Sequence, residues 1–206
     1  EDGLDEDGYI KYVDVDEDGS INALDKVIIG NPYPDFFYGF SSNLSFKNFE
    51  FNLFLEGVYG NEIFNATNGT HLNSFQRGNN QFTDIMGNYW TAENPDPNAK
   101  YPRISSLTGI DISDRFIEDG SYLRVKSIRL AYNFPLENWG LNVFDYAQIF
   151  VSGTNLFTFT KYEGLDPEMN TRGTDSQQIG SRLQMGHDQS GYPNAKNYTL
   201  GLKLSF

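Results

Sequence analysis

Apolar and polar positions alternate most clearly at the end of the chain. In residues 197–206 an apolar side chain occupies every second position: Tyr198, Leu200, Leu202, Leu204 and Phe206. A period of two places these side chains on one face of a β-strand. Residues 36–46 and 49–59 alternate in the same way, and only Lys47 and Asn48 separate them. We therefore expect three strands, the first two of which form a tight hairpin.

Two further strands are predicted, at 119–134 and 146–161. In the first, the apolar positions change parity near Lys126 and Ser127, which indicates a β-bulge. The second alternates less regularly because Phe150 and Leu156 lie on its polar parity. All five predicted strands are roughly 10 to 15 residues long, whereas strands of globular proteins average about five or six and bilayer-crossing strands need about 9 to 11.

The connections between the predicted strands alternate between short and long. The first and third are short, whereas the loops 60–116 and 162–196 are long and rich in turn-forming residues. This rhythm is typical of an outer-membrane barrel, with brief periplasmic turns and long extracellular loops. Aromatic residues lie near the strand ends, as the girdles at a lipid–water interface require. They are Phe36, Tyr38, Tyr59, Tyr132, Phe134, Tyr146, Tyr162, Tyr198 and Phe206.

The predicted fold class is all-β: the last five or so strands of an antiparallel transmembrane β-barrel with long extracellular loops. The alternative is a soluble β-sandwich, but sandwiches have shorter strands and more evenly spaced turns. Five strands cannot close a pore-sized barrel, and an open edge in hydrocarbon leaves backbone groups unsatisfied, so we expect further strands outside this chain. The predicted organisation is an acidic extracellular loop at 1–35 followed by barrel strands and loops at 36–206.

Charge and composition exclude several classes of protein. The chain carries 28 acidic and 15 basic residues, a net charge of −13 that does not suit a nucleic-acid partner. It has no cysteine, which excludes disulfides and thiolate metal sites. No apolar run approaches the length of a transmembrane helix. Glu1 is not followed by a signal-peptide pattern, so we expect a processed protein or a chain that begins within a longer one.

An acidic segment near the start has the spacing of a calcium-binding loop. The pattern D-x-D-x-D-G-x-I-N-x-x-D supplies six predicted ligands: Asp14, Asp16, Asp18, Ser20 through its carbonyl, Asn22 and Asp25. Gly19 permits the sharp turn. Aspartate at the last position makes bidentate binding less certain than glutamate does, and no helices are predicted on either side. We expect a structural Ca²⁺ site; the alternative is a solvated acidic turn.

Catalytic chemistry is not indicated, and we expect no enzyme. His71 and His187 lie in predicted loops without a patterned nucleophile, and no phosphate loop or nucleophile elbow is present. No spacing singles out a pair of carboxylates of the kind that glycosidases use. Aromatic loop residues can stack on sugar rings or can hold the loop together, and the sequence does not choose between these roles. They are Phe75, Phe82, Tyr89, Trp90 and Tyr101.

The chain contains several distinctive segments in order: the calcium-type loop, residues 28–34 (IIGNPYP), 115–126 (RFIEDGSYLRVK), 151–162 (VSGTNLFTFTKY), 164–168 (GLDPE), Tyr192-Pro193 and the terminal strand. Together, these segments resemble the C-terminal end of SusC/RagA-type TonB-linked outer-membrane proteins of Bacteroidota. The resemblance implies a 22-stranded barrel with an N-terminal plug, located in the outer membrane. This chain lacks the plug, the TonB-contact segment and most of the barrel.

The resemblance also implies a function and partners. It implies a TonB-dependent nutrient importer that takes up oligosaccharides or peptides with a SusD-like surface lipoprotein, and that contacts TonB through the missing N-terminal part. The last strand, Tyr198 to Phe206, resembles the signal read by the barrel-assembly machinery, which pairs with an edge strand. We keep two alternatives: a secreted, calcium-stabilised β-domain that binds glycans and, less favoured, a hydrolase.

Overall fold

The structure is a computed structural model that describes residues 1–68, 80, 82–104, 112–139, 143–168, 185–188 and 191–206. The chain divides into two compact units. The first consists of the described residues of Glu1–Pro32, Ile63–Glu118 and Asn170–Gly191, and the second of those of Tyr33–Glu62, Asp119–Met169 and Tyr192–Phe206. The described residues of 63–118 thus group with the N-terminal segment, apart from the long strands.

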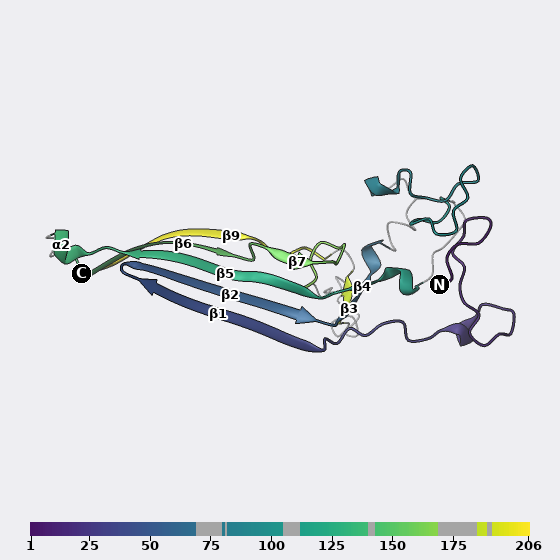
Figure 1. Ribbon diagram of the computed structural model, residues 1–206, viewed down its shortest axis with the longest axis horizontal. Helices are drawn as coiled ribbons and strands as arrows, with labels where there is room; N and C mark the ends of the chain where they lie inside the picture. The colour runs from purple at the N-terminus through teal and green to yellow at the C-terminus, as the bar shows by residue number, and fades with distance from the viewer. Residues whose placement is uncertain (69–79, 81, 105–111, 140–142, 169–184, 189–190) are drawn as a thin grey trace, which may run out of the picture. The chain divides into compact units, whose positions relative to one another are not determined.

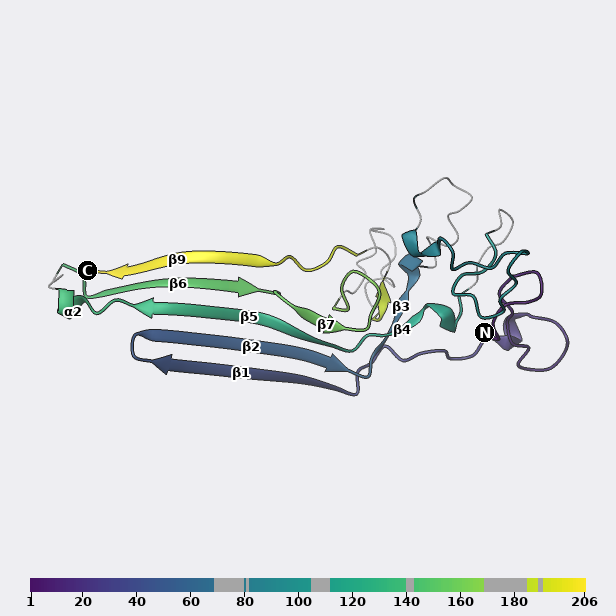
Figure 2. The same cartoon turned by 45° about the horizontal axis from the view of Figure 1, so that its top comes forward.

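The second unit is an antiparallel sheet of long strands. Among the described residues its strands are β1 (Phe36–Phe46), β2 (Phe49–Tyr59), β5 (Tyr122–Asn133), β6 (Tyr146–Thr154) and β9 (Asn197–Ser205), in the spatial order β1-β2-β5-β6-β9 (Figure 1). Figure 2 shows the same strands side by side from a second direction. Each long strand pairs with the one before it in this series, so the predicted antiparallel fold class is confirmed.

The turns of the sheet follow from local sequence. β1 and β2 are joined by Lys47 and Asn48, as predicted, and Lys47 adopts a positive φ of 53°. The Asn48 side chain donates to the Asn133 carbonyl at 2.8 Å and so ties this turn to the end of β5. The short helix α2 (Leu136–Trp139) lies between β5 and β6. Within the described part of the chain, no helix is long and apolar enough to cross a membrane.

The predicted bulge near Lys126 is confirmed. Ser127 pairs with Phe54 and Val125 pairs with Leu55, so Lys126 is an extra residue in β5. A period-two strand exchanges its faces when one residue is inserted. Because of the bulge, Val125 faces the same side of the sheet as Ile128, although the two residues have opposite parity. The apolar face therefore continues past the bulge.

The prediction of one uninterrupted strand at 146–161 was wrong. β6 ends at Thr154, Asn155 has a positive φ of 54°, and the separate strand β7 (Thr158–Thr160) continues beside β5. This break lies opposite the bulge in β5, where the amide of Asn155 donates to the carbonyl of Lys126 at 3.1 Å. The two strands thus change register together, which single-strand periodicity cannot reveal.

The strand predicted at 119–134 is also divided. Residues 117–119 form the separate strand β4 (Ile117–Asp119), and β5 begins after Gly120 and Ser121. The Asp119 carboxylate accepts a hydrogen bond from the Ser121 amide at 2.9 Å, a local turn that competes with the extended ladder. Hydrogen bonds from the Ser121 side chain and amide hold the pKa of Asp119 below its usual value, although burial opposes the shift.

The long connections contain more structure than the sequence predicted. A second sheet has the order β4-β3-β8, with β3 at Glu62–Asn65 and β8 at His187–Asp188, and most of its residues belong to the first unit. The 3₁₀ turns of this unit are η1 (Ala23–Asp25), η3 (Thr83–Ile85) and η4 (Asp114–Phe116). Ile85 and Phe116 form a small buried core, against which Phe64, Tyr89 and Tyr101 pack.

Two strand glycines provide a matched test of sheet packing. Gly57 in β2 lies under the ring of its cross-strand partner Tyr38, and a Cβ there would also come within 2.6 Å of the Tyr122 carbonyl oxygen. We expect Gly57→Ala to destabilise the protein by about 1–3 kcal/mol, because moving the Tyr38 ring does not relieve the clash with the backbone. A Cβ at Gly39 would make only ordinary contacts, at 3.6 Å.

Urea unfolding in lipid vesicles measures the difference between these two variants. Gly39→Ala should retain the wild-type free energy of unfolding within about 0.5 kcal/mol. Equal effects of the two substitutions would contradict the close packing of Tyr38 and Tyr122 around Gly57.

Candidate functional site: a two-faced sheet and an acidic loop

One face of the long sheet is apolar and exposed. Directly paired residues lie on the same face, and the register aligns apolar side chains across the strands. One such row is Leu44, Phe51, Leu130, Val151 and Leu200, and the next is Phe46, Phe49, Tyr132, Ile149 and Leu202. Leu44 is 61% exposed and Leu200 is 76% exposed. Adjacent exposed rows of this kind mark a surface that contacts an apolar protein partner or a lipid.

The opposite face is polar and internally hydrogen-bonded. Gln148 donates to Asn133 at 2.7 Å and accepts from Arg129 at 2.6 Å, while Asn133 donates to Glu50 at 2.7 Å. These residues come from β2, β5 and β6, and the cross-strand register brings them together. Asn43 and Asn52 are paired in the same way on β1 and β2, at 2.6 Å. A face with this chemistry suits contact with water.

Aromatic side chains lie toward both ends of the strands, as predicted. Phe36 stacks on Tyr59 at one end, with a centroid distance of 5.1 Å. Phe49 packs against Tyr132 at 4.8 Å near the opposite end. Other ring pairs lie in and beside the turns at that second end: Tyr132–Phe134, Phe134–Trp139 and Phe144–Phe206. Trp139 and Phe144 were not predicted at these ends, because they lie outside the alternating runs.

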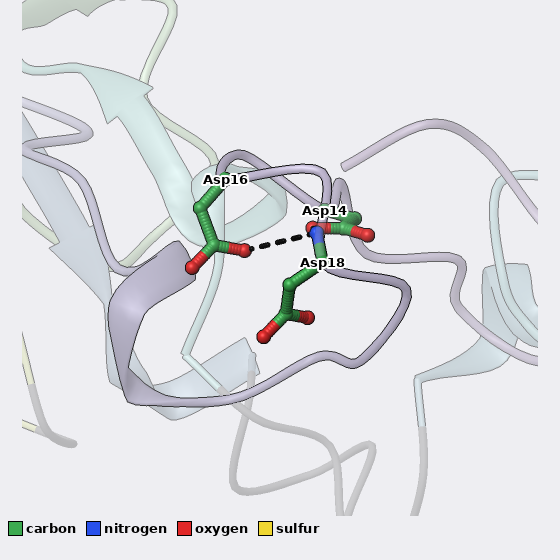
Figure 3. A group of neighbouring side chains, drawn as sticks. All are labelled: Asp14, Asp16 and Asp18. Carbon is green, nitrogen blue, oxygen red and sulfur yellow. Dashed lines mark hydrogen bonds between the residues drawn. The ribbon is translucent and has the colours of Figure 1, made fainter.

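The acidic loop brings three of its predicted metal ligands together. Asp14, Asp16 and Asp18 each offer a carboxylate oxygen, and the three oxygens lie within 4.8 Å of one another (Figure 3). Glu17 and Gly19 adopt positive φ values of 59° and 84°, and these curve the loop. The amides of Asp18 and Gly19 donate to Asp14, at 3.3 and 2.7 Å. The loop thus has a folded conformation that gathers negative charge on one side.

The other three predicted ligands lie on the second half of the loop. The Asp25 carboxylate accepts from the amides of Val15 and Asn22, each at 2.7 Å, and so closes the two ends of the loop. These hydrogen bonds, from Asn22 first and then Val15, hold the pKa of Asp25 below its usual value. The Asn22 side chain caps η1 through Leu24 and donates to the Ser20 carbonyl at 3.0 Å.

Among the loop aromatics, Trp90 and Tyr101 have the most specific contacts. Trp90 is 5% exposed; its ring covers Gly8, and Arg103 lies over it at 5.7 Å. The Tyr101 hydroxyl donates to Asp84 at 2.8 Å. The remaining aromatic and histidine candidates are placed as follows: Tyr89 packs against the small core, Phe82 lies next to η3, His187 is part of β8, and Phe75 and His71 lie outside the described residues.

Comparison with known proteins gives a consistent relationship. No protein-family model matches the chain. It is 36% identical over 201 residues to the TonB-dependent receptor P26 of Formosa agariphila, an alignment that covers 97% of this chain and 20% of that receptor. It is 28% identical over 200 residues to the TonB-dependent receptor SusC of Bacteroides thetaiotaomicron, which covers 95% of this chain and 17% of SusC.

A solved structure shows the same fold. The structure of the RagAB peptide transporter matches with a TM-score of 0.76 and 24% sequence identity, over 99% of this chain and 22% of that one. The chain thus spans about a fifth of the length of the proteins it matches.

Strand length, antiparallel order and the two-faced sheet define the class: part of an antiparallel transmembrane β-barrel. Within that class, the chain is homologous to one segment of the SusC/RagA-type TonB-dependent receptors, so the predicted relationship is confirmed.

Proposed function

We propose that this chain forms barrel strands of a TonB-dependent nutrient importer in a bacterial outer membrane. The observation that carries the proposal is the exposed apolar face of the long sheet, backed by a polar face with its own hydrogen bonds. In a barrel, the first face contacts acyl chains and the second lines an aqueous interior. Relatives named as TonB-dependent receptors support energised uptake.

The proposal extends to cargo and partners. Similarity to SusC and to the RagAB peptide transporter supports an oligosaccharide or peptide cargo and a SusD-like lipoprotein partner. TonB would contact a part of the receptor outside this chain. The long loops would lie outside the cell, and the Lys47-Asn48 turn would face the periplasm.

Fractionation and uptake test this function. We expect the full-length receptor to sediment with outer membranes, to resist extraction by weak detergent, and to support growth on oligosaccharides or peptides that a deletion strain cannot use. The competing interpretation is a secreted β-domain that binds glycans. If this chain folds as a soluble monomer without detergent, the result favours the secreted β-domain and refutes the importer proposal.

We further propose that the acidic loop binds one structural Ca²⁺ ion. The proposed ligands are Asp14, Asp16, Asp18, the Ser20 carbonyl, Asn22 and Asp25. Hard carboxylate and carbonyl oxygens at these spacings suit the six or more contacts that Ca²⁺ takes. The gathering of the three aspartates supports the first half of this set. The ion would offset their mutual repulsion and crosslink the two halves of the loop.

A pair of double variants tests the calcium site. Asp16→Asn with Asp18→Asn should weaken Ca²⁺ binding to the full-length receptor at least about tenfold, because two ligand charges are lost. The same variant should lose calcium-dependent protection from trypsin at Lys11 and Lys26. The matched control is Asp5→Asn with Asp7→Asn, which removes the same charge from the neighbouring turn. Equal calorimetric titrations for both variants would show that the loop is only an acidic turn.

The last strand is proposed as the signal for barrel assembly. Its apolar residues alternate up to Phe206, and β9 pairs with β6 on one side. Within this chain, the other side of β9 carries no strand among the described residues, so it offers an edge to which another sheet can add.

A further inference from the structure

Arg124 in β5 is almost completely buried and is held by two carboxylates. Its side chain is 2% exposed, and its guanidinium donates to Asp166, which is 4% exposed, and to Glu168. The third nitrogen of the guanidinium, Nε, donates to the Thr158 hydroxyl at 3.0 Å. A buried guanidinium is tolerated only where its charge and its donors are satisfied in this way.

The same carboxylates hold a second segment of the chain. Asp166 accepts a hydrogen bond from the amide of Asn194 at 2.9 Å, and Glu168 accepts one from the Asn194 side chain at 3.2 Å. Asp166 also accepts from the amide of Glu168 at 2.9 Å. Asn194 lies shortly before β9, whereas Asp166 follows β7. Residues 162–168 and 192–196 are the two arms of the loop that connects β7 to β9. The buried Arg124 contacts the first arm directly and the second arm through the carboxylates of Asp166 and Glu168.

The bulge supplies the second cation of this cluster. Lys126, the extra residue in β5, lies 2.6 Å from Glu168 and 3.5 Å from Glu56. Glu168 therefore pairs with both cations, Arg124 and Lys126, whereas Asp166 pairs with Arg124.

We propose that Arg124 positions both arms of the loop as one unit, through an ionic latch made of Arg124, Lys126, Asp166 and Glu168. The latch fixes residues 162–168 and 192–196 against β5, so that neither arm leaves without the other. It rests on the proposed function only in placing this loop outside the membrane.

The charge balance keeps the latch closed at neutral pH. Burial raises the pKa of Asp166. Hydrogen bonds from Arg124 and from the amides of Glu168 and Asn194 lower this pKa by more than burial raises it, so the net shift is downward. Other charged or titratable groups of the latch region are Tyr122, which interacts electrostatically with Asp166, Glu168 and Glu56, and Lys126, which pairs with Glu168 and Glu56. A carboxylate with a lowered pKa contributes stability above its unfolded value near about 4, and this contribution is lost as the pH falls through the folded pKa.

Hydrogen exchange in the full-length receptor tests the latch. In Arg124→Gln we expect the amides of both Glu168 and Asn194 to exchange at least about tenfold faster at neutral pH, while β6 and β9 keep wild-type rates. The matched control is Arg129→Gln, on the same strand and face, whose guanidinium bonds Gln148 within the sheet. It should leave both arms protected. Arg124→Lys, which keeps the charge but not the fork of donors, should give an intermediate rate.

Two results would overturn the latch: faster exchange in one arm only, or unchanged exchange in both arms. Asp166→Asn provides a second route if Arg124→Gln does not assemble, and it should open both arms as well. A receptor missing from the outer membrane in its wild-type form would refute the proposed function, whereas an assembled receptor with independent arms would refute only the latch.

Discussion

Leu200→Arg is expected to destabilise the assembled receptor by about 2–4 kcal/mol, the cost of a cation on the lipid face near the bilayer midplane. Leu200 pairs directly with Val151, whose other partner is Leu130, so the new charge would lie within an apolar row that crosses the strands near the middle of β9. Its neighbours on that row offer no polar group. Urea unfolding in lipid vesicles and the amount of receptor in outer membranes measure the effect.

The neighbouring residue is the matched control. Thr199 lies at nearly the same depth on β9 but on the opposite face, where it pairs with Ser152. Thr199→Arg should be tolerated, with a change within about 0.5 kcal/mol, because the cation reaches water. If both arginines are tolerated equally, the apolar face does not contact lipid and the membrane assignment fails.

Removing residues 197–206 from the full-length receptor should abolish its accumulation in the outer membrane. β9 pairs with β6 from Tyr146 to Thr154, and its loss would leave that edge of β6 without backbone partners. Each unsatisfied backbone group in hydrocarbon costs several kcal/mol, so the summed penalty exceeds the stability of an ordinary fold. Membrane fractionation and the shift in electrophoretic mobility on heating, typical of folded barrels, measure the result.

A single substitution separates strand pairing from recognition of Phe206. Phe206 follows β9, is 83% exposed and contacts Phe144 at a centroid distance of 5.5 Å. Phe206→Ala removes no ladder hydrogen bond, so a purely structural role predicts nearly normal levels. Recognition by the assembly machinery predicts a strong fall in membrane-inserted receptor, with normal stability of the molecules that do insert. Normal levels would refute the assembly signal.

The irregularities in β5 and β6 show which insertions the alternation of apolar residues can predict. The change of parity near Lys126 was visible in the sequence because residues on both sides of it are apolar. The break at Asn155 was not, because Phe157 and Phe159 keep the parity of Val151, although this stretch holds one residue more than β5 and two more than β2 between paired positions. An insertion of an odd number of residues changes the parity of the apolar positions, whereas an even number leaves it unchanged. An even insertion is therefore detected only from the register with the partner strands.

The acidic loop and the latch differ in the same respect. Asp14, Asp16 and Asp18 are close in sequence, so their spacing alone predicted that they gather. Asp166 and Arg124 are 42 positions apart, and nothing in the local pattern of either residue indicates the other. Trp90 was left with two possible roles, and its contact with Gly8, far away in the chain, favours packing.

By itself, the sequence determined the strands β1, β2 and β9, the apolar face of the long sheet, the hairpin turn and the gathering of the three aspartates, because each depends on residues within a few positions of one another. The tertiary structure decided the register between strands, the order β1-β2-β5-β6-β9, the structure within the long connections and the ion cluster around Arg124. These features depend on contacts between distant segments, whose free energy comes from burial and charge pairing and leaves no periodic trace in the chain.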